Sequence, residues 1–130
     1  FIEGTKFDVS VSLEQVNTPS FIPKIEQFLD RIESIFPFVM NGSYEINTSN
    51  SFPHSSGIAS SASGMSALAL CICDIASKKG LLDSEKFFQT ASILSRLGSG
   101  SASRSVFGPL GVWGEHPDFE GSSDDFAISY

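Results

Sequence analysis

The chain has 130 residues, 41% of them hydrophobic, and a formal net charge of −7 at neutral pH. This length suits one compact domain with a real core and is too short for two. The acidic balance argues against nucleic acid or an anionic membrane as partner, since both select clustered Lys and Arg. The longest apolar run, residues 65–76, is interrupted by Ser66 and Asp74 and is too short to span a bilayer.

The first third of the chain predicts a strand, a helix and a second strand. Apolar and polar residues alternate over residues 5–16, which is the period of a half-buried strand. From Phe21 to Phe36 apolar residues recur at three and four, so we expect an amphipathic helix that Pro37 ends. The second strand lies in the stretch NGSYEINTSNSF, after a turn at Asn41 and Gly42.

The remainder predicts mainly helices. A helix from Ile58 to Lys79 is apolar almost all round and is therefore expected to be buried, with Gly80 as its C-terminal signal. The next helix is capped by Asp83 or Ser84. Its inward residues are expected to be Phe87, Phe88, Ala91, Leu94 and Leu97. A short helix in SASRSVF, a strand in GPLGVWG, an acidic loop and a last strand follow, which together predict an α+β sandwich with helices on one face of a mixed sheet.

The two cysteines, Cys71 and Cys73, lie two residues apart in the apolar helix and so point to different sides of it. They cannot bridge each other there. Free cysteines of this kind are ordinary in a reducing compartment, which favours the cytoplasm.

The stretch PHSSGIASSASG places small polar residues where the apolar helix starts. Backbone N–H groups at a helix start lack partners and carry a partial positive charge, so an anion is their natural ligand. Gly57 allows close approach of the backbone, and hydroxyl donors surround it: Ser55, Ser56, Ser60 and Ser61. This composition predicts a phosphate cradle without the Gly-Lys-Ser/Thr of a Walker loop. The alternative is a plain connection with a capping serine.

The second stretch, LGSGSASRSVFG, repeats this pattern and adds an arginine. Gly98, Ser99, Gly100 and Ser101 form the second cradle. Arg104, on the following helical turn, can hold a carboxylate or phosphate through two parallel hydrogen bonds. Two cradles predict two anionic ligands.

No metal site is expected, because His54 and His116 lack further ligands at metal spacing. The pair Asp124 and Asp125 is interpreted as part of an acidic solvated loop.

These two stretches resemble the GHMP group of small-molecule kinases and, within it, the diphosphomevalonate decarboxylases. The group's phosphate loop is matched by Pro53, Gly57, Ile58, Ala59, Ser60, Ser61, Ala62 and Gly64. The decarboxylase family is indicated by Asn50-Ser51-Phe52-Pro53 before the loop and by the second motif from Gly98 to Gly108. The resemblance is strong over residues 50–114, weaker over 21–44 and nearly absent before Phe21.

The resemblance implies the fold of a GHMP-kinase N-terminal domain, which is also the fold of a domain of a small-subunit ribosomal protein. It implies ATP-dependent decarboxylation of mevalonate 5-diphosphate to isopentenyl diphosphate, in the mevalonate pathway of isoprenoid biosynthesis. Ser60 and Ser61 would hold and orient the phosphates of ATP and Mg²⁺, with Ser55, Ser56 and Gly57 beside them. Ser99, Gly100 and Ser101 would hold the substrate diphosphate. Arg104, catalytic together with Ser61, would grip the substrate carboxylate, and the family often forms homodimers.

Compared with the family, the chain departs at Ile58, Ser103 and Pro109, where Leu, Cys and Gly are usual. Substrate-binding residues of the family's N-terminal segment and the catalytic Asp of its C-terminal domain have no counterpart in it. Because the chain also opens on Phe1, we expect residues 1–130 to be a partial N-terminal domain without the C-terminal domain, and inactive alone. Two alternatives stay open: a related kinase that stops at the phosphorylated product, and a non-catalytic binding module.

Overall fold

The computed structural model describes residues 1–51 and 60–130. The chain divides into two compact units, Phe1–Ile58 and Ala59–Tyr130. That residues 1–130 form part of a single domain stays a prediction.

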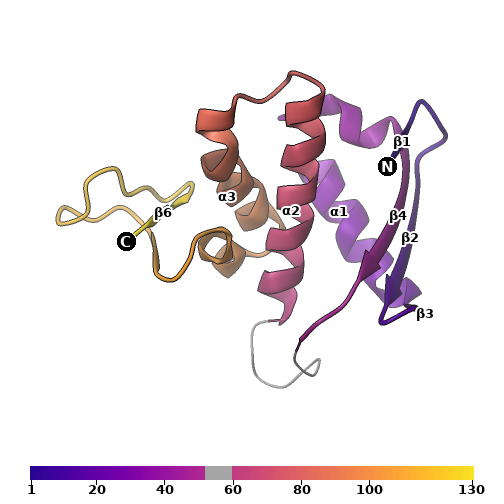
Figure 1. The fold of residues 1–130 in the computed structure, drawn as a ribbon, viewed down its shortest axis with the longest axis horizontal. Coiled ribbons are helices and arrows are strands. Elements are labelled where there is room, and N and C mark those ends of the chain that lie inside the picture. Colours follow the sequence, from indigo (N-terminus) through magenta and orange to yellow (C-terminus); the bar gives the residue numbers. More distant parts are fainter. Residues whose placement is uncertain (52–59) are drawn as a thin grey trace. The chain divides into compact units, whose positions relative to one another are not determined.

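The first unit contains a four-stranded sheet in the order β1-β4-β2-β3 (Figure 1). Its strands are β1 (Ile2–Glu3), β2 (Asp8–Leu13), β3 (Val16–Asn17) and β4 (Gly42–Thr48). β2 and β4 are parallel, whereas β1 and β3 pair antiparallel with β4 and β2. The sheet is therefore mixed, as predicted, and the alternation in β2 buries Val9 and Val11.

Helix α1 (Ile22–Ile32) connects the two parallel strands and packs against β2. A 3₁₀ turn, η1 (Pro19–Phe21), precedes it, and another, η2 (Pro37–Met40), leads into β4. The predicted apolar stripe is present, since α1 buries Ile25, Phe28, Leu29 and Ile32. The helix ends before Pro37 is reached. A residue that precedes proline is disfavoured in helical backbone, and Phe36 is accordingly extended, with a φ of −129°.

The turns of this unit differ from the sequence expectation. Glu14 and Gln15 join β2 to β3 with φ values of 51° and 65°, which is the backbone of a two-residue hairpin turn normally signalled by Asn-Gly. Asn41 and Gly42 do not form such a turn. Asn41 ends η2, and Gly42 begins β4 at a place where an added Cβ would lie 2.5 Å from the carbonyl oxygen of Ile2. Gly42 is needed for close strand approach.

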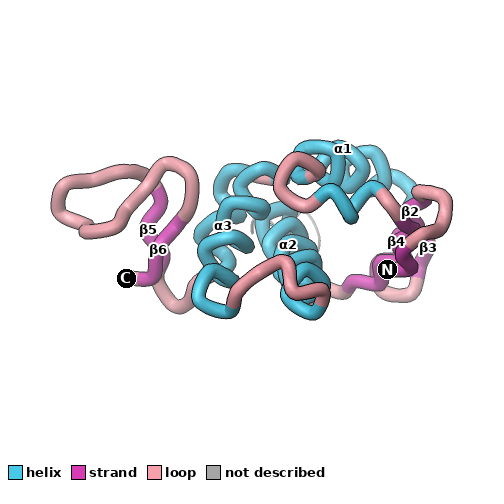
Figure 2. The backbone as a smooth tube through the Cα atoms, turned by 90° about the horizontal axis from the view of Figure 1, so that it is seen from above, coloured by secondary structure: helices cyan, strands magenta, loops and turns pink. Residues whose placement is uncertain are grey.

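The second unit is built on helices α2 (Ser60–Lys78) and α3 (Phe87–Gly98), which pack against each other and against the 3₁₀ helix η4 (Gly100–Val106) (Figure 2). The predicted end of α2 is confirmed. Gly80 has a φ of 72°, and the Leu81 amide donates to the Ala76 carbonyl at 2.9 Å. This is the Schellman arrangement that glycine favours.

The inward face of α3 is only partly as predicted. Ala91 and Leu94 are buried, but Phe88 is 55% exposed, and its ring contacts Phe87 and Phe107 instead. The prediction for Phe88 is wrong because two serines, Ser92 and Ser95, take the buried face of the helix and are both 0% exposed. The 3₁₀ turn η3 (Ser84–Lys86) precedes α3, and Asp83 at its N-cap makes no side-chain capping bond.

A separate two-stranded antiparallel sheet, β5 (Gly111–Trp113) and β6 (Ala127–Ser129), closes the second unit. Both strands were expected. The acidic loop between them is held by Asp124, whose carbonyl accepts from the Trp113 indole at 2.8 Å and whose carboxylate accepts from the Glu115 amide at 3.0 Å.

Candidate functional site

The serine-rich segment after α3 forms a 3₁₀ helix, and this geometry decides which of its side chains face outward. Ser99 is extended, with a φ of −161°, and so turns the chain from α3 into η4. A 3₁₀ helix has three residues per turn, so side chains three apart lie above one another. Ser101 and Arg104 therefore share one face, and Phe107 follows η4 directly with extended backbone. Ala102 and Ser103 point into the core and are 0% exposed.

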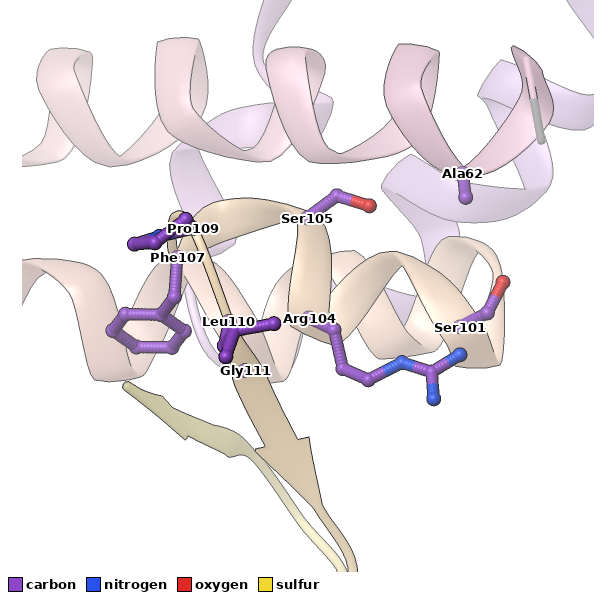
Figure 3. Close-up of a pocket in the computed structure, with 8 residues that line it drawn as sticks. All are labelled: Ala62, Ser101, Arg104, Ser105, Phe107, Pro109, Leu110 and Gly111. Carbon is purple, nitrogen blue, oxygen red and sulfur yellow. The ribbon is translucent and has the colours of Figure 1, made fainter. Parts of the chain in front are cut away.

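That outward face lines a pocket of about 340 Å³ within the second unit (Figure 3). The pocket takes Ala62 from the first turn of α2, the outward face of η4, and the segment that enters β5. Its lining residues are Ala62, Ser101, Arg104, Ser105, Phe107, Pro109, Leu110 and Gly111. The volume falls at the lower end of the range for small-ligand sites.

The pocket has a polar end and an apolar end. In Figure 3 the guanidinium of Arg104 extends toward Ser101, on the side of Ala62, whereas Phe107 and Pro109 lie at the opposite end. Gly111 allows the start of β5 to lie close to η4, because an added Cβ there would lie 3.3 Å from the Arg104 carbonyl oxygen. One end can thus hold an anion and the other an aliphatic skeleton.

Arg104 is exposed, and among the residues that the structure describes it has no ion pair and no side-chain hydrogen bond. By contrast, Arg96 is paired with Asp125 at 3.1 Å. The five N–H donors of the Arg104 guanidinium are thus not taken by a carboxylate of the described chain, and a guanidinium matches carboxylate and phosphate groups in bidentate geometry.

The structure brings two of the four predicted substrate-binding residues into the pocket, Ser101 and Arg104. Ser99 and Gly100 lie on the backbone just before them but do not line it. Gly100 instead lies under the Trp113 ring, where an added Cβ would be 3.4 Å from the ring carbon Cη2.

The predicted ATP-binding residues are described only in part. Ser60 is the first residue of α2, and Ser61, next to the pocket residue Ala62, is exposed on its first turn. Ser55, Ser56 and Gly57 lie outside the described residues. In the described ranges no cluster of three or more His, Cys, Asp or Glu side chains could hold a metal ion.

Sequence reasoning missed the residues that hold η4 and β6 in place. The Ser92 hydroxyl donates to the Ser103 carbonyl at 2.9 Å and accepts from the Ala127 amide at 2.8 Å. One turn later, Arg96 donates through Nε to the Asp125 carbonyl at 2.9 Å and through Nη2 to the Asp125 carboxylate at 3.1 Å. The only available signal was the position of Ser92, four residues after Phe88 in the predicted helix.

Burial raises the pKa of the Cys73 thiol to about 12, so this residue is not a thiolate nucleophile at neutral pH. It is 0% exposed in α2. In the first unit, burial likewise raises the pKa of the Tyr44 phenol, which donates to the Val39 carbonyl at 2.8 Å. Cys73 is not among the residues that line the pocket.

The mixed sheet with packed helices defines a mixed α/β protein of the kind formed by GHMP-kinase N-terminal domains. The chain belongs to the diphosphomevalonate decarboxylase-like N-terminal domain family, whose model matches residues 5–127. The match therefore extends well before Phe21, where the motif resemblance was nearly absent.

Curated relatives carry the same family name. The chain is 37% identical over 130 residues to a diphosphomevalonate decarboxylase of Ganoderma lucidum, covering 98% of this chain and 30% of that protein. It is 36% identical over 99 residues to one of Gibberella zeae, covering 75% of this chain and 24% of that protein. A third, from Aspergillus fumigatus, is 29% identical over 119 residues. The chain thus spans less than a third of the relatives it matches, and no solved structure gives a significant match.

Proposed function

We propose that the complete protein carrying this chain catalyses the ATP-dependent decarboxylation of mevalonate 5-diphosphate to isopentenyl diphosphate. The observation that carries the proposal is the outward face of η4, where Ser101 and Arg104 line one pocket and Arg104 has no carboxylate partner in the described chain. The family to which the chain belongs and the names of its relatives support the choice of reaction.

Each residue has a separate part in this proposal. Arg104 holds the substrate carboxylate with two parallel hydrogen bonds, and Ser101 with the Ser99–Gly100 backbone holds the diphosphate. ATP supplies the phosphoryl group that turns the tertiary hydroxyl into a leaving group. Ser60 and Ser61, with Ser55, Ser56 and Gly57, orient the phosphates of ATP. Ser60 and Ser61 would also hold Mg²⁺ together with those phosphates, and the ion would neutralise the charge that the phosphates carry.

We also propose a cytoplasmic location. Both cysteines are free, one exposed and one buried, which suits a reducing compartment. None of the helices in the described parts of the chain is long and apolar enough to cross a membrane. A homodimer stays a prediction.

The test is a coupled assay of ADP and carbon dioxide release from mevalonate 5-diphosphate with the complete gene product. We expect both products together, and Arg104→Gln should lower kcat/KM by roughly 10- to 150-fold, the equivalent of about 1.5–3 kcal/mol for lost charge-assisted hydrogen bonds. The matched control, Arg31→Gln, removes the same charge from α1 and should leave kcat/KM unchanged. Residues 1–130 alone should release neither product.

Two outcomes would overturn the proposal. ADP release with a stable phosphorylated product and no carbon dioxide would show a kinase. No ADP release by the complete protein, combined with no calorimetric binding of ATP or inorganic diphosphate, would show a non-catalytic binding module.

A further inference from the structure

Ser92 is a fully buried serine in the middle of α3 whose hydroxyl joins three separate elements. It donates to the carbonyl of Ser103 in η4 at 2.9 Å and accepts from the amide of Ala127 in β6 at 2.8 Å. Its side chain is 0% exposed. A hydroxyl can donate once and accept twice, so one small group satisfies a buried carbonyl and a buried N–H at once.

The link to η4 lies next to the pocket. Ser103 is 0% exposed and directly precedes Arg104, so the carbonyl that Ser92 holds belongs to the peptide unit that leads into the pocket arginine. A shift of this peptide unit displaces Arg104 directly, and a shift of η4 as a whole displaces Ser101, which lies on the same face three residues earlier.

The link to β6 reaches the opposite wall. Ala127 is paired with Trp113, and Ser129 with Gly111, in the two-stranded sheet. The Tyr130 amide also donates to the Leu110 carbonyl at 3.0 Å. Since Leu110 and Gly111 line the pocket, the position of β6 sets the position of that wall. Arg96, one turn after Ser92, adds a second attachment at Asp125.

We propose that Ser92 is a positioning residue that fixes the spacing of the two pocket walls, η4 on one side and the Pro109–Gly111 segment on the other. Its action is on Arg104 through the Ser103 peptide and on Leu110 through β6. The ligand whose binding it tunes is the diphosphate substrate, and that part of the inference rests on the proposed function.

Ser95 provides a matched control on the same helix. It is also a serine and also 0% exposed, but its hydroxyl donates at 2.6 Å to the Ala91 carbonyl of its own helix. Ser95→Ala removes a buried hydroxyl without cutting a link between elements, so any difference between the two variants reports the link.

The experiment compares Ser92→Ala with Ser95→Ala in the complete gene product by steady-state kinetics in both substrates. We expect Ser92→Ala to raise KM for mevalonate 5-diphosphate about tenfold or more, because small misplacements of binding groups have large effects. KM for ATP should stay unchanged. A general loss of folded protein would lower kcat without moving either KM, and Ser95→Ala should leave both KM values unchanged. Equal effects of the two variants on the KM of the diphosphate substrate would overturn the inference.

Amide hydrogen exchange keeps the test independent of activity. Ser92→Ala should speed exchange at Ala127 and across residues 100–106 about tenfold relative to Ser95→Ala. If the wild-type protein shows no turnover, the proposed function fails, but the exchange experiment still tests Ser92. Equal amide exchange rates in Ser92→Ala and Ser95→Ala would then overturn the positioning role as well. If Ser92→Ala does not fold, Ser92→Cys keeps a side chain of the same connectivity, with a somewhat larger and weaker hydrogen-bonding group, and should shift KM and exchange in the same direction. Wild-type values for Ser92→Cys would overturn the inference.

Discussion

The two units of the chain are stabilised by different kinds of core. The first unit buries large side chains, among them Phe28, Leu29 and Phe36, and its described buried residues include no serine. The second unit buries mainly alanines, and four serines as well: Ser66, Ser92, Ser95 and Ser103. Small side chains let backbones approach closely, and buried hydroxyls must find partners in fixed directions. The pocket lies in the second unit, where geometry is set by directed bonds.

The contrast between the two cores is tested most strongly at Phe28 of α1, whose side chain is 1% exposed. Phe28→Ala should lower the free energy of unfolding by about 3–5 kcal/mol, because a large cavity is left in a core made of large residues. The measurement is urea unfolding followed by circular dichroism.

Phe88→Ala in α3 is the matched control, since Phe88 is 55% exposed. We expect it to cost less than about 1 kcal/mol, close to the range of surface substitutions. A loss as large as that of Phe28→Ala would mean that the second unit also depends on aromatic burial, and the contrast between the two cores would be lost.

The second unit should be more sensitive to added volume than to lost volume. Ala69 is 0% exposed on α2, so Ala69→Leu should lower the free energy of unfolding by about 1–3 kcal/mol through overpacking. Ala67→Leu places the same side chain at an exposed position of the same helix and should be nearly neutral, because leucine is a good helix former. If both variants unfold at the same urea concentration, close packing around Ala69 is not a source of stability.

The same difference explains how far the sequence could be interpreted. In the first unit the apolar periods of β2 and α1 predicted strand, helix and buried face, because burial there follows hydrophobicity. In α3 the period predicted Phe88 inward and could not predict Ser92, since a serine is buried only when distant groups supply its partners. Those partners, Ser103 and Ala127, lie 11 and 35 residues further along the chain.

The candidate site shows the same limit. The Gly-Ser-Arg composition was enough to single out Ser101 and Arg104, because donors near a helix start are a local property of the sequence. The 3₁₀ geometry of η4, which places Ser101 and Arg104 on one face, and the wall formed by Leu110 and Gly111 depend on how β5 and β6 are attached to α3. No local pattern contains that information.

A smaller effect is expected where the second unit uses a partly exposed hydrogen bond. Trp113 donates its indole N–H to the Asp124 carbonyl at 2.8 Å. Trp113→Phe keeps an aromatic ring and removes the donor, so the free energy of unfolding should fall by about 0.5–1.5 kcal/mol. Circular dichroism is the suitable probe because Trp113 is the only tryptophan. An unchanged urea midpoint would mean that water replaces the indole at Asp124.

The buried titratable groups, Cys73 and Tyr44, should not affect the free energy of unfolding at neutral pH. Their effect on stability should appear only in alkali. Burial raises the pKa of Cys73 in the second unit from 9.0 to about 12. The unfolded chain therefore loses this proton first, so the stability that the neutral thiol contributes is complete below about pH 9 and is lost as pH rises toward 12. The raised pKa of the Tyr44 phenol acts in the same direction in the first unit, but from about pH 10 upward.

Urea midpoints measured from pH 8 to 11 separate these two contributions. Cys73→Ala should flatten the decline that begins near pH 9, whereas Cys71→Ala, at an exposed position two residues earlier, should leave it unchanged. Tyr44→Phe should flatten only the later part. A decline that starts at the same pH in the Cys73→Ala and wild-type proteins would show that the thiol is not shielded from ionisation. The small-residue core of the second unit would then admit water, and directed hydrogen bonds such as those of Ser92 would lose the apolar surroundings that make them strong.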